Sequence, residues 1–435
     1  ILASSFMFIF WSKTASAETM NMFMVWLALW IYLSRKISHK PIYAIIFYVT
    51  LATSAFCKGL IAPFLVIFSL LFTNLFESIL NVKKTGFSYK NFFKCVSLET
   101  EWLFSSSSAK GIVAGLIVFF LFLFTPVMVT GSWESVELLW RENFLRFFKP
   151  FDHIEPFYVY LKYIPFFIAP WTFVFVASLF NLKRWLYDKN HRWIIFIAMS
   201  IFIFFTSSGS RRGYYILPIL PALAIITGET LDNWLETQEF PKKDAIYWAM
   251  ISTCFFPFFA GTGFIYGYTR EWLLKSPFFV LLGILIIVAA ICIILLFWKK
   301  RFYKGFVWLS IIIFSLELWA YTTGIAIQES RRTLVPFVNK VSAIIENVRD
   351  EDIALYKISS SAFIFYLKRH RIKTIDSLDG LKAFVSEKNQ RYVITGIDDS
   401  AILFEKEDLK KPEILLVEKE KRKNRDNPIV LLSFP

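Results

Sequence analysis

The chain has 435 residues, of which 56% are apolar and 19% aromatic, with 50 Phe and a formal net charge of +14. This composition excludes an ordinary soluble domain, because apolar runs of bilayer-spanning length recur along the chain. The charge does not indicate nucleic-acid binding, since many Lys and Arg stand in short loops between apolar runs, where they set membrane topology. We therefore expect a polytopic α-helical membrane protein with no nucleic-acid partner.

The apolar runs predict about 10 to 11 spanning helices, some of them short for a bilayer. In chain order they lie at about 1–10, 21–33, 41–57, 60–77, 111–129, 165–180, 193–206, 214–228, 245–266, 277–297 and 306–325. The chain begins at Ile1, inside an apolar run and without a signal-peptide pattern. We therefore expect a fragment whose N-terminal part is missing, with a membrane domain at 1–328.

Short basic loops orient these helices. If successive helices cross the membrane in alternating directions, four basic loops fall on the same side: 34–40, 81–94, 181–193 and 298–305. Lys and Arg concentrate on the cytoplasmic side of a membrane, so we place these loops inside. The opposite, extracytoplasmic side then carries the loops 130–164 and 207–213 and the segment 329–435.

The segment 329–435 changes abruptly to a mixed polar composition and predicts a small soluble α/β domain. Helical spacing of apolar residues predicts helices at 333–348, 361–369 and 378–387. Strand patterns lie at 352–357, 391–396, 413–420 and 429–434. The domain carries no nucleotide-binding loop, and the four scattered cysteines (Cys57, Cys95, Cys254 and Cys292) predict neither a disulfide framework nor a metal site.

Two adjacent arginines, Arg211 and Arg212, come out on the external side, against the usual charge bias. In one interpretation they extend toward lipid headgroups. In the other they form an anion site, which the small residues of "SSGS" at 207–210 favour because they let an oxyanion approach closely.

The external loop 130–164 mixes Trp and Phe with charged residues, as a helix lying in the membrane interface does. On such a helix Glu142 and Arg146 stand four residues apart and can pair, which would hold the arginine where a phosphate could meet it. His153 follows in the same loop and is a candidate phosphate ligand or acid–base group, because its ordinary pKa is near neutral.

Two further candidates stand at helix ends on the same side. Glu18 precedes an apolar run, where a carboxylate either favours the helix N-terminus or orients and activates an acceptor. Lys58 lies in a helix–helix turn beside Gly59, where a phosphate-bearing headgroup could reach it.

Four stretches of the sequence together resemble one family. They are "ASAETMNMFMVWLALWIYL", "FCKGLIAPFLV", "WRENFLRFF" with the aromatic segment after it, and "FFTSSGSRRGYYILPILPALAII". In order and spacing they are similar to the C-type membrane glycosyltransferases, in the branch of aminoarabinose transferases and protein O-mannosyltransferases. The similarity spans about residues 10–230, and "SSGSRRGYYILP" is its most specific motif.

The resemblance implies a hexosyl- or pentosyltransferase that takes a sugar from a polyprenyl-phosphate carrier at the outer face of the inner membrane. The acceptor would be lipid A, a glycan or a protein. Lys58, Arg211, Arg212, Tyr214, His153 and Arg146 match the family's phosphate-side positions, with Glu142 and Asn143 supporting them. Glu18 matches the second acidic position, while the principal catalytic aspartate is expected in a loop before residue 1. No cofactor is implied, and metal dependence varies within the family.

Two alternatives stay open from the sequence. A polyprenyl-linked polysaccharide polymerase or ligase would share the lipid carrier and the external basic groups. A secondary transporter would instead show repeated halves and charged residues near the middle of its helices, and the sequence shows neither.

Overall fold

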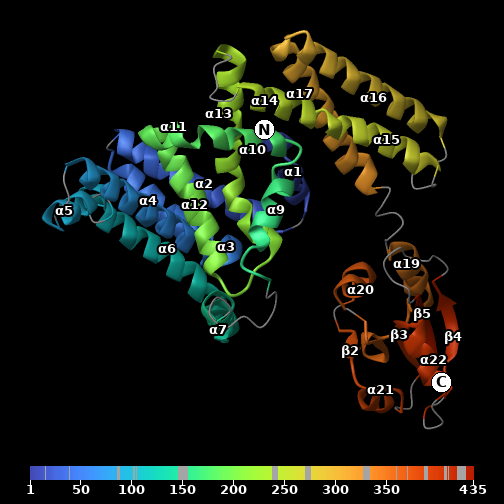
Figure 1. Ribbon diagram of the computed structural model, residues 1–435. Helices are drawn as coiled ribbons and strands as arrows, with labels where there is room; N and C mark the ends of the chain where they lie inside the picture. Colours follow the sequence, from blue (N-terminus) through green and yellow to red (C-terminus); the bar gives the residue numbers. More distant parts are fainter. Residues whose placement is uncertain are drawn as a thin grey trace. The chain divides into compact units, whose positions relative to one another are not determined.

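The computed structural model divides the chain into two compact units, Ile1–Leu318 and Trp319–Pro435. Figure 1 labels the helices and strands of both units. The expected boundary at 328/329 lies outside the described residues. Those residues are 1–14, 16–38, 40–85, 89–100, 103, 105–145, 155–237, 243–269, 276–326, 334–358, 360–369, 371–386, 390–405, 409, 411–418 and 428–435.

The first unit is helical throughout its described residues. Its first half contains α1 (Phe6–Lys13), α2 (Glu18–Ser38), α3 (Ile42–Lys58), α4 (Ile61–Thr85), α5 (Tyr89–Thr100), α6 (Ser106–Thr130), α7 (Glu134–Trp140) and the π-helical turn η3 (Arg141–Leu145). Its second half contains α9 (Val159–Phe167), α10 (Thr172–Ser178), α11 (Leu182–Tyr187), α12 (Lys189–Ser207), the 3-10 helix η5 (Gly213–Ile219), α13 (Leu220–Thr237), α14 (Lys243–Thr253), α15 (Phe255–Thr269), α16 (Pro277–Trp298) and α17 (Phe302–Trp319).

The expected class, a polytopic helical membrane protein with a small C-terminal sheet, is confirmed. Six helical stretches in the described residues are long and apolar enough to cross a membrane, or seven if α9 and the helices after it count as one span bent by 113°. Two further apolar helices, Ile42–Lys58 and His191–Ser207, are shorter. Other apolar runs of the sequence fold as shorter helices; α1, for example, has 8 residues.

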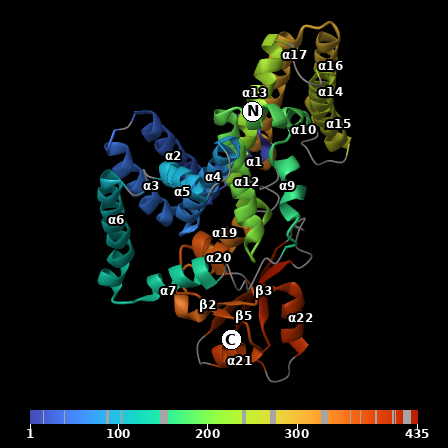
Figure 2. The ribbon, with the colours of Figure 1, turned by 60° about the vertical axis from the view of Figure 1, so that its left-hand side comes forward.

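Helices α3 and α6 pack closely against each other, and both are labelled in Figures 1 and 2. Gly111 and Gly115 of α6 stand four residues apart on one face. A Cβ added to Gly111 would lie 2.6 Å from the carbonyl oxygen of Ala44, and one added to Gly115 would lie 2.8 Å from that of Tyr48. Small residues at this spacing let two membrane helices bring their backbones together.

A buried ion pair joins α4 to α12. Arg192 Nε and Nη2 each donate to a carboxylate oxygen of Glu77, both at 2.7 Å, and both residues are almost fully buried. Further along the same two helices, the hydroxyl of Ser200 in α12 donates to the hydroxyl of Ser69 in α4 at 2.8 Å. These contacts satisfy polar groups that would otherwise be costly in an apolar interior.

The second unit is a five-stranded sheet in the order β2-β1-β3-β5-β4, formed by β1 (Ile353–Tyr356), β2 (Lys373–Ile375), β3 (Arg391–Gly396), β4 (Glu413–Val417) and β5 (Ile429–Phe434). Strands β1, β2 and β3 are parallel, whereas β5 is antiparallel to β3 and β4. The four expected strands are present; β2 was not predicted, because three residues carry almost no pattern.

Helices cover both faces of this sheet. Phe337 and Val341 of α19 (Val335–Ile344) and Phe363 of α20 (Ser360–Leu367) pack with Ile353 and Leu355 on one face. Side chains of α21 (Leu378–Val385) and α22 (Ile397–Glu405) pack with the alternate residues of β1 on the other face. The alternation follows from the two-residue period of a strand, and it gives the unit a core of its own.

Candidate functional site

The candidate site includes the Lys58–Gly59 turn between α3 and α4. Helix α3 ends at Lys58 and α4 begins at Ile61, so two residues reverse the chain. Gly59 has a φ of 72°, in the left-handed region that favours glycine. A Cβ at this position would also lie 2.4 Å from Oδ1 of Asn143. Glycine is therefore required both by the turn and by the neighbour packed on it.

The ammonium group of Lys58 contacts both carboxylate oxygens of Glu18, the first residue of α2. The Lys58 side chain is 19% exposed and the Glu18 side chain 8%. The same Nζ lies 4.5 Å from the centre of the Tyr215 ring and 5.7 Å from that of Tyr214. The Glu18 carboxylate balances the charge of the ammonium, and the aromatic faces beside the pair also favour a cation there.

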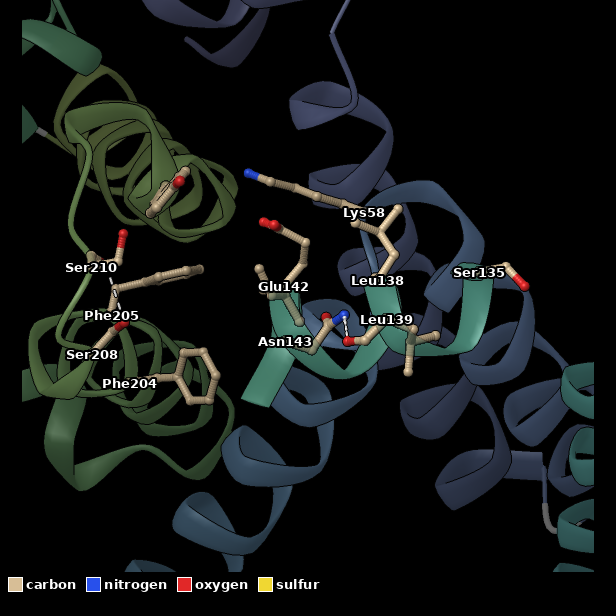
Figure 3. Close-up of a pocket in the computed structure, with 13 residues that line it drawn as sticks. Lys58, Ser135, Leu138, Leu139, Glu142, Asn143, Phe204, Phe205, Ser208 and Ser210 are labelled. Carbon is tan, nitrogen blue, oxygen red and sulfur yellow. Dashed lines mark hydrogen bonds between the residues drawn. The ribbon is translucent and has the colours of Figure 1, made fainter. Parts of the chain in front are cut away.

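Lys58 lines a cavity of about 370 Å³. The other lining residues come from the α3–α4 turn and α4, from α7 and η3, and from α12, η5 and the segment between them: Gly59, Ile61, Ser135, Leu138, Leu139, Glu142, Asn143, Phe204, Phe205, Ser208, Ser210 and Tyr215. Figure 3 shows the ends of Lys58 and Glu142 pointing into the same space, with Phe204 and Phe205 opposite. The cavity lining thus combines one cationic group, Lys58, and one carboxylate, Glu142, with mostly apolar walls.

Arg212 and Tyr214 line a second cavity, of about 350 Å³, together with Trp11, Tyr163 and other residues. Nη1 of Arg212 donates to the Tyr214 hydroxyl, and the guanidinium carbon lies 5.6 Å from the centre of the same ring. Trp11 packs on Tyr214 with ring centres 4.6 Å apart. The neighbouring pair Tyr214 and Tyr215 therefore stands between the two cavities.

Arg211 has different surroundings from Arg212, although the two are adjacent. Its guanidinium donates to the backbone carbonyl of Thr206 from Nε at 3.2 Å and from Nη2 at 3.0 Å. Nη1 donates to the carbonyl of Glu155 at 2.7 Å. These contacts bind the 155 segment to the end of α12, and Arg211 is absent from the lining of both described cavities.

The structure thus divides the residues expected at one phosphate site. Lys58, Glu142 and Asn143 line the first cavity with Glu18 behind Lys58, while Arg212 and Tyr214 line the second. Arg146 and His153 lie outside the described residues, and so does the expected Glu142–Arg146 pair. Within the described residues, Glu142 accepts from Nε of Arg141 at 3.4 Å.

Sequence reasoning missed two aromatic residues of the site, Tyr215 and Trp11. Tyr215 was part of the quoted "GYYILP" motif, yet no sequence feature separated it from Tyr214. Trp11 stands in an apolar run and gave no signal. In the described part of the chain, no three His, Cys, Asp or Glu side chains are grouped so as to hold a metal ion.

The chain combines a helical membrane unit, which contains a mostly apolar cavity with a lysine in its lining, and a following α/β unit. This combination is that of a membrane enzyme fold with an appended α/β domain. The chain has the fold of the ArnT transferases. Its structure is similar to the crystal structure of ArnT from Cupriavidus metallidurans bound to undecaprenyl phosphate, with a TM-score of 0.63 and 14% identity, over 100% of this chain and 77% of that one. The apo structure of the same protein gives a TM-score of 0.63 at 12% identity.

In sequence, the chain is 25% identical over 240 residues to the undecaprenyl phosphate-alpha-4-amino-4-deoxy-L-arabinose arabinosyl transferase of Shewanella sediminis. That match covers 54% of this chain and 43% of the relative. No family model matches the chain. The resemblance to the aminoarabinose transferase branch, stated from the motifs, is confirmed.

Proposed function

We propose that the protein is an integral-membrane glycosyltransferase that moves a sugar from a polyprenyl-phosphate carrier to an acceptor at the outer face of the inner membrane. The observation that carries this proposal is the first cavity, in which Lys58 stands at the end of mostly apolar walls. Such a cavity suits an amphiphile whose anionic head meets the lysine. The ArnT relative bound to undecaprenyl phosphate supports the same class of donor.

The proposed chemistry needs little from the protein at the donor, because a phosphate is already a good leaving group. It requires positive charge to hold the departing phosphate, and a base for the acceptor hydroxyl. We assign the first task to Lys58. Glu18 contacts the Lys58 ammonium, and we assign it to orienting that group and the acceptor.

We propose lipid A as the first acceptor to test, with a glycan or a protein as the other outcomes, and a pentose as the first sugar. The curated relative carries an arabinosyl transferase name, which supports a pentosyl donor. We place the loops 130–164 and 207–213 and the segment 329–435 outside the cytoplasm, because the basic loops then face inward.

The binding half of this proposal is tested with undecaprenyl phosphate and the protein in lipid nanodiscs. Lys58→Ala should weaken binding about ten- to hundredfold, the worth of a charge-assisted contact to a partly buried anion. Lys110→Ala is the matched control, because Lys110 is an exposed lysine at the start of α6. Equal affinities of the wild type and Lys58→Ala for the lipid would remove Lys58 from the site.

A polyprenyl-linked polymerase or ligase stays the second candidate, because it would bind the same carrier. The two activities differ in the acceptor. Growth of a glycan chain on the carrier, with no transfer to lipid A or protein, would favour the polymerase.

A further inference from the structure

The start of α4 leaves backbone N–H groups without a partner inside the helix, and that of Leu60, in the turn that carries Lys58, is one of them. Leu60 precedes the first residue of α4, so its N–H has no carbonyl four residues earlier in a continuing helix. Its own carbonyl already accepts from Phe64 at 3.1 Å. A buried or half-buried N–H in this position needs an acceptor from elsewhere in the chain.

Asn143 supplies that acceptor from 83 residues further along the chain. Its Oδ1 accepts from Leu60 N at 2.6 Å. Its Nδ2 donates to the carbonyl of Leu139 at 2.7 Å, within its own α7–η3 segment. Figure 3 shows the second of these bonds beside the cavity. One amide therefore joins the Lys58 turn to the segment that forms a wall of the cavity.

The fit around this amide is specific in shape. Gly59 lies so close that its absent Cβ would fall 2.4 Å from Oδ1 and 2.9 Å from Nδ2 of Asn143. The amide thus fixes both the hydrogen bond to Leu60 and the position of Gly59. Lys58 ends α3 and directly precedes Gly59, so it adjoins the residue that packs on this amide.

We propose that Asn143 is a positioning residue: by holding Leu60 N–H it sets where the Lys58 ammonium meets the phosphate of the polyprenyl carrier. This inference rests on the proposed function and goes beyond the supporting place that the family motif gave to Asn143. In this proposal Asn143 affects phosphate binding only through the position of Lys58. The α7–η3 segment therefore helps to position the cation as well as forming a wall of the cavity.

The test is a double-mutant cycle with undecaprenyl phosphate in nanodiscs. Asn143→Ala should weaken binding about tenfold in the wild-type background, and it should change binding less than twofold, about the limit of additivity, in the Lys58→Ala background. Additive losses in the two backgrounds, or a wild-type affinity for Asn143→Ala, would overturn the proposal. If the wild type itself bound no undecaprenyl phosphate, the proposed function would fail instead.

Asn233→Ala is the matched control. Asn233 is an exposed residue of α13 whose amide also donates to the carbonyl four residues earlier, that of Glu229, at 2.9 Å. The Asn233→Ala variant should leave both the affinity for undecaprenyl phosphate and the thermal unfolding of the protein unchanged.

A second measurement needs no ligand. The rate at which an amine-specific reagent labels Lys58, read by mass spectrometry, reports how the turn presents the ammonium. Asn143→Ala should change this rate at least severalfold while leaving the labelling of exposed Lys110 unchanged. An unchanged Lys58 rate in a folded variant would contradict the positioning role whether or not the protein binds polyprenyl phosphate.

Discussion

At the scale of single residues, Gly59 and Gly131 provide a natural comparison. Both have positive φ, 72° and 71°. A Cβ at Gly59 would meet Asn143, whereas at Gly131 nothing lies within 4 Å of it. They differ in ψ, which is −164° at Gly59 and 3° at Gly131, so Gly59 combines a backbone conformation that is almost restricted to glycine with a lack of space.

We predict that Gly131→Ala lowers the free energy of unfolding by about 1 kcal/mol, the usual cost of alanine at positive φ. Gly59→Ala should cost clearly more, because Asn143 must also move, and it should weaken binding of the polyprenyl phosphate. Unfolding in detergent, followed by Trp fluorescence, measures both variants. Equal destabilisation of the two variants would contradict this prediction.

The two arginines show how far sequence reasoning reached at this scale. The motif containing Arg211 and Arg212 was recognisable, and so were Glu18 and Lys58. Their division between two cavities and a backbone contact was not predictable, because Arg211 binds the carbonyl of Glu155, a residue 56 positions earlier. Such a contact depends on the tertiary fold and leaves no local pattern.

At the scale of helices, the close contact between α3 and α6 depends on glycine. Gly111→Ala would place a Cβ 2.6 Å from the Ala44 carbonyl oxygen, so the two helices must separate. We predict a destabilisation of about 1–3 kcal/mol, the usual cost of overpacking. Gly263→Ala, in α15 with nothing within 4 Å, should be neutral or slightly stabilising. A Gly111→Ala variant as stable as Gly263→Ala in thermal unfolding would contradict this packing.

The Glu77–Arg192 pair gives a second prediction at this scale. Replacing one partner leaves a buried charge, so Glu77→Leu or Arg192→Met alone should lower the free energy of unfolding by about 3–5 kcal/mol. The double variant should lie much closer to the wild type, because it buries no unpaired charge. Losses that simply add in the double variant would show that the two side chains act independently.

The bent pair α9 and α10 shows a feature of the fold that hydropathy does not predict. The apolar run 165–180 is continuous in composition, but α9 ends at Phe167 and α10 begins at Thr172. Pro170 lies in this break; it has no N–H to donate and disfavours the helical conformation in the residue before it. The composition predicts one apolar segment, whereas the proline breaks that segment into two helices at an angle to each other.

At the scale of the whole molecule, the second unit should be stable by itself. Its sheet is covered by helices on both faces, and each face has a buried apolar cluster. We predict that residues 334–435, expressed alone, give a soluble domain with a cooperative thermal transition in circular dichroism. A chain without such a transition would show that the unit depends on the membrane part.

The central claim is that the protein transfers a sugar from a polyprenyl phosphate that meets Lys58. The most direct measurement is transfer of a radiolabelled pentose from undecaprenyl phosphate to lipid A in membranes, with the protein expressed from its full open reading frame. We predict transfer by the wild type and by Lys110→Ala, and a loss of at least about tenfold in Lys58→Ala. Transfer undiminished in Lys58→Ala, or no transfer to any acceptor by folded wild-type protein that binds the carrier, would contradict the claim.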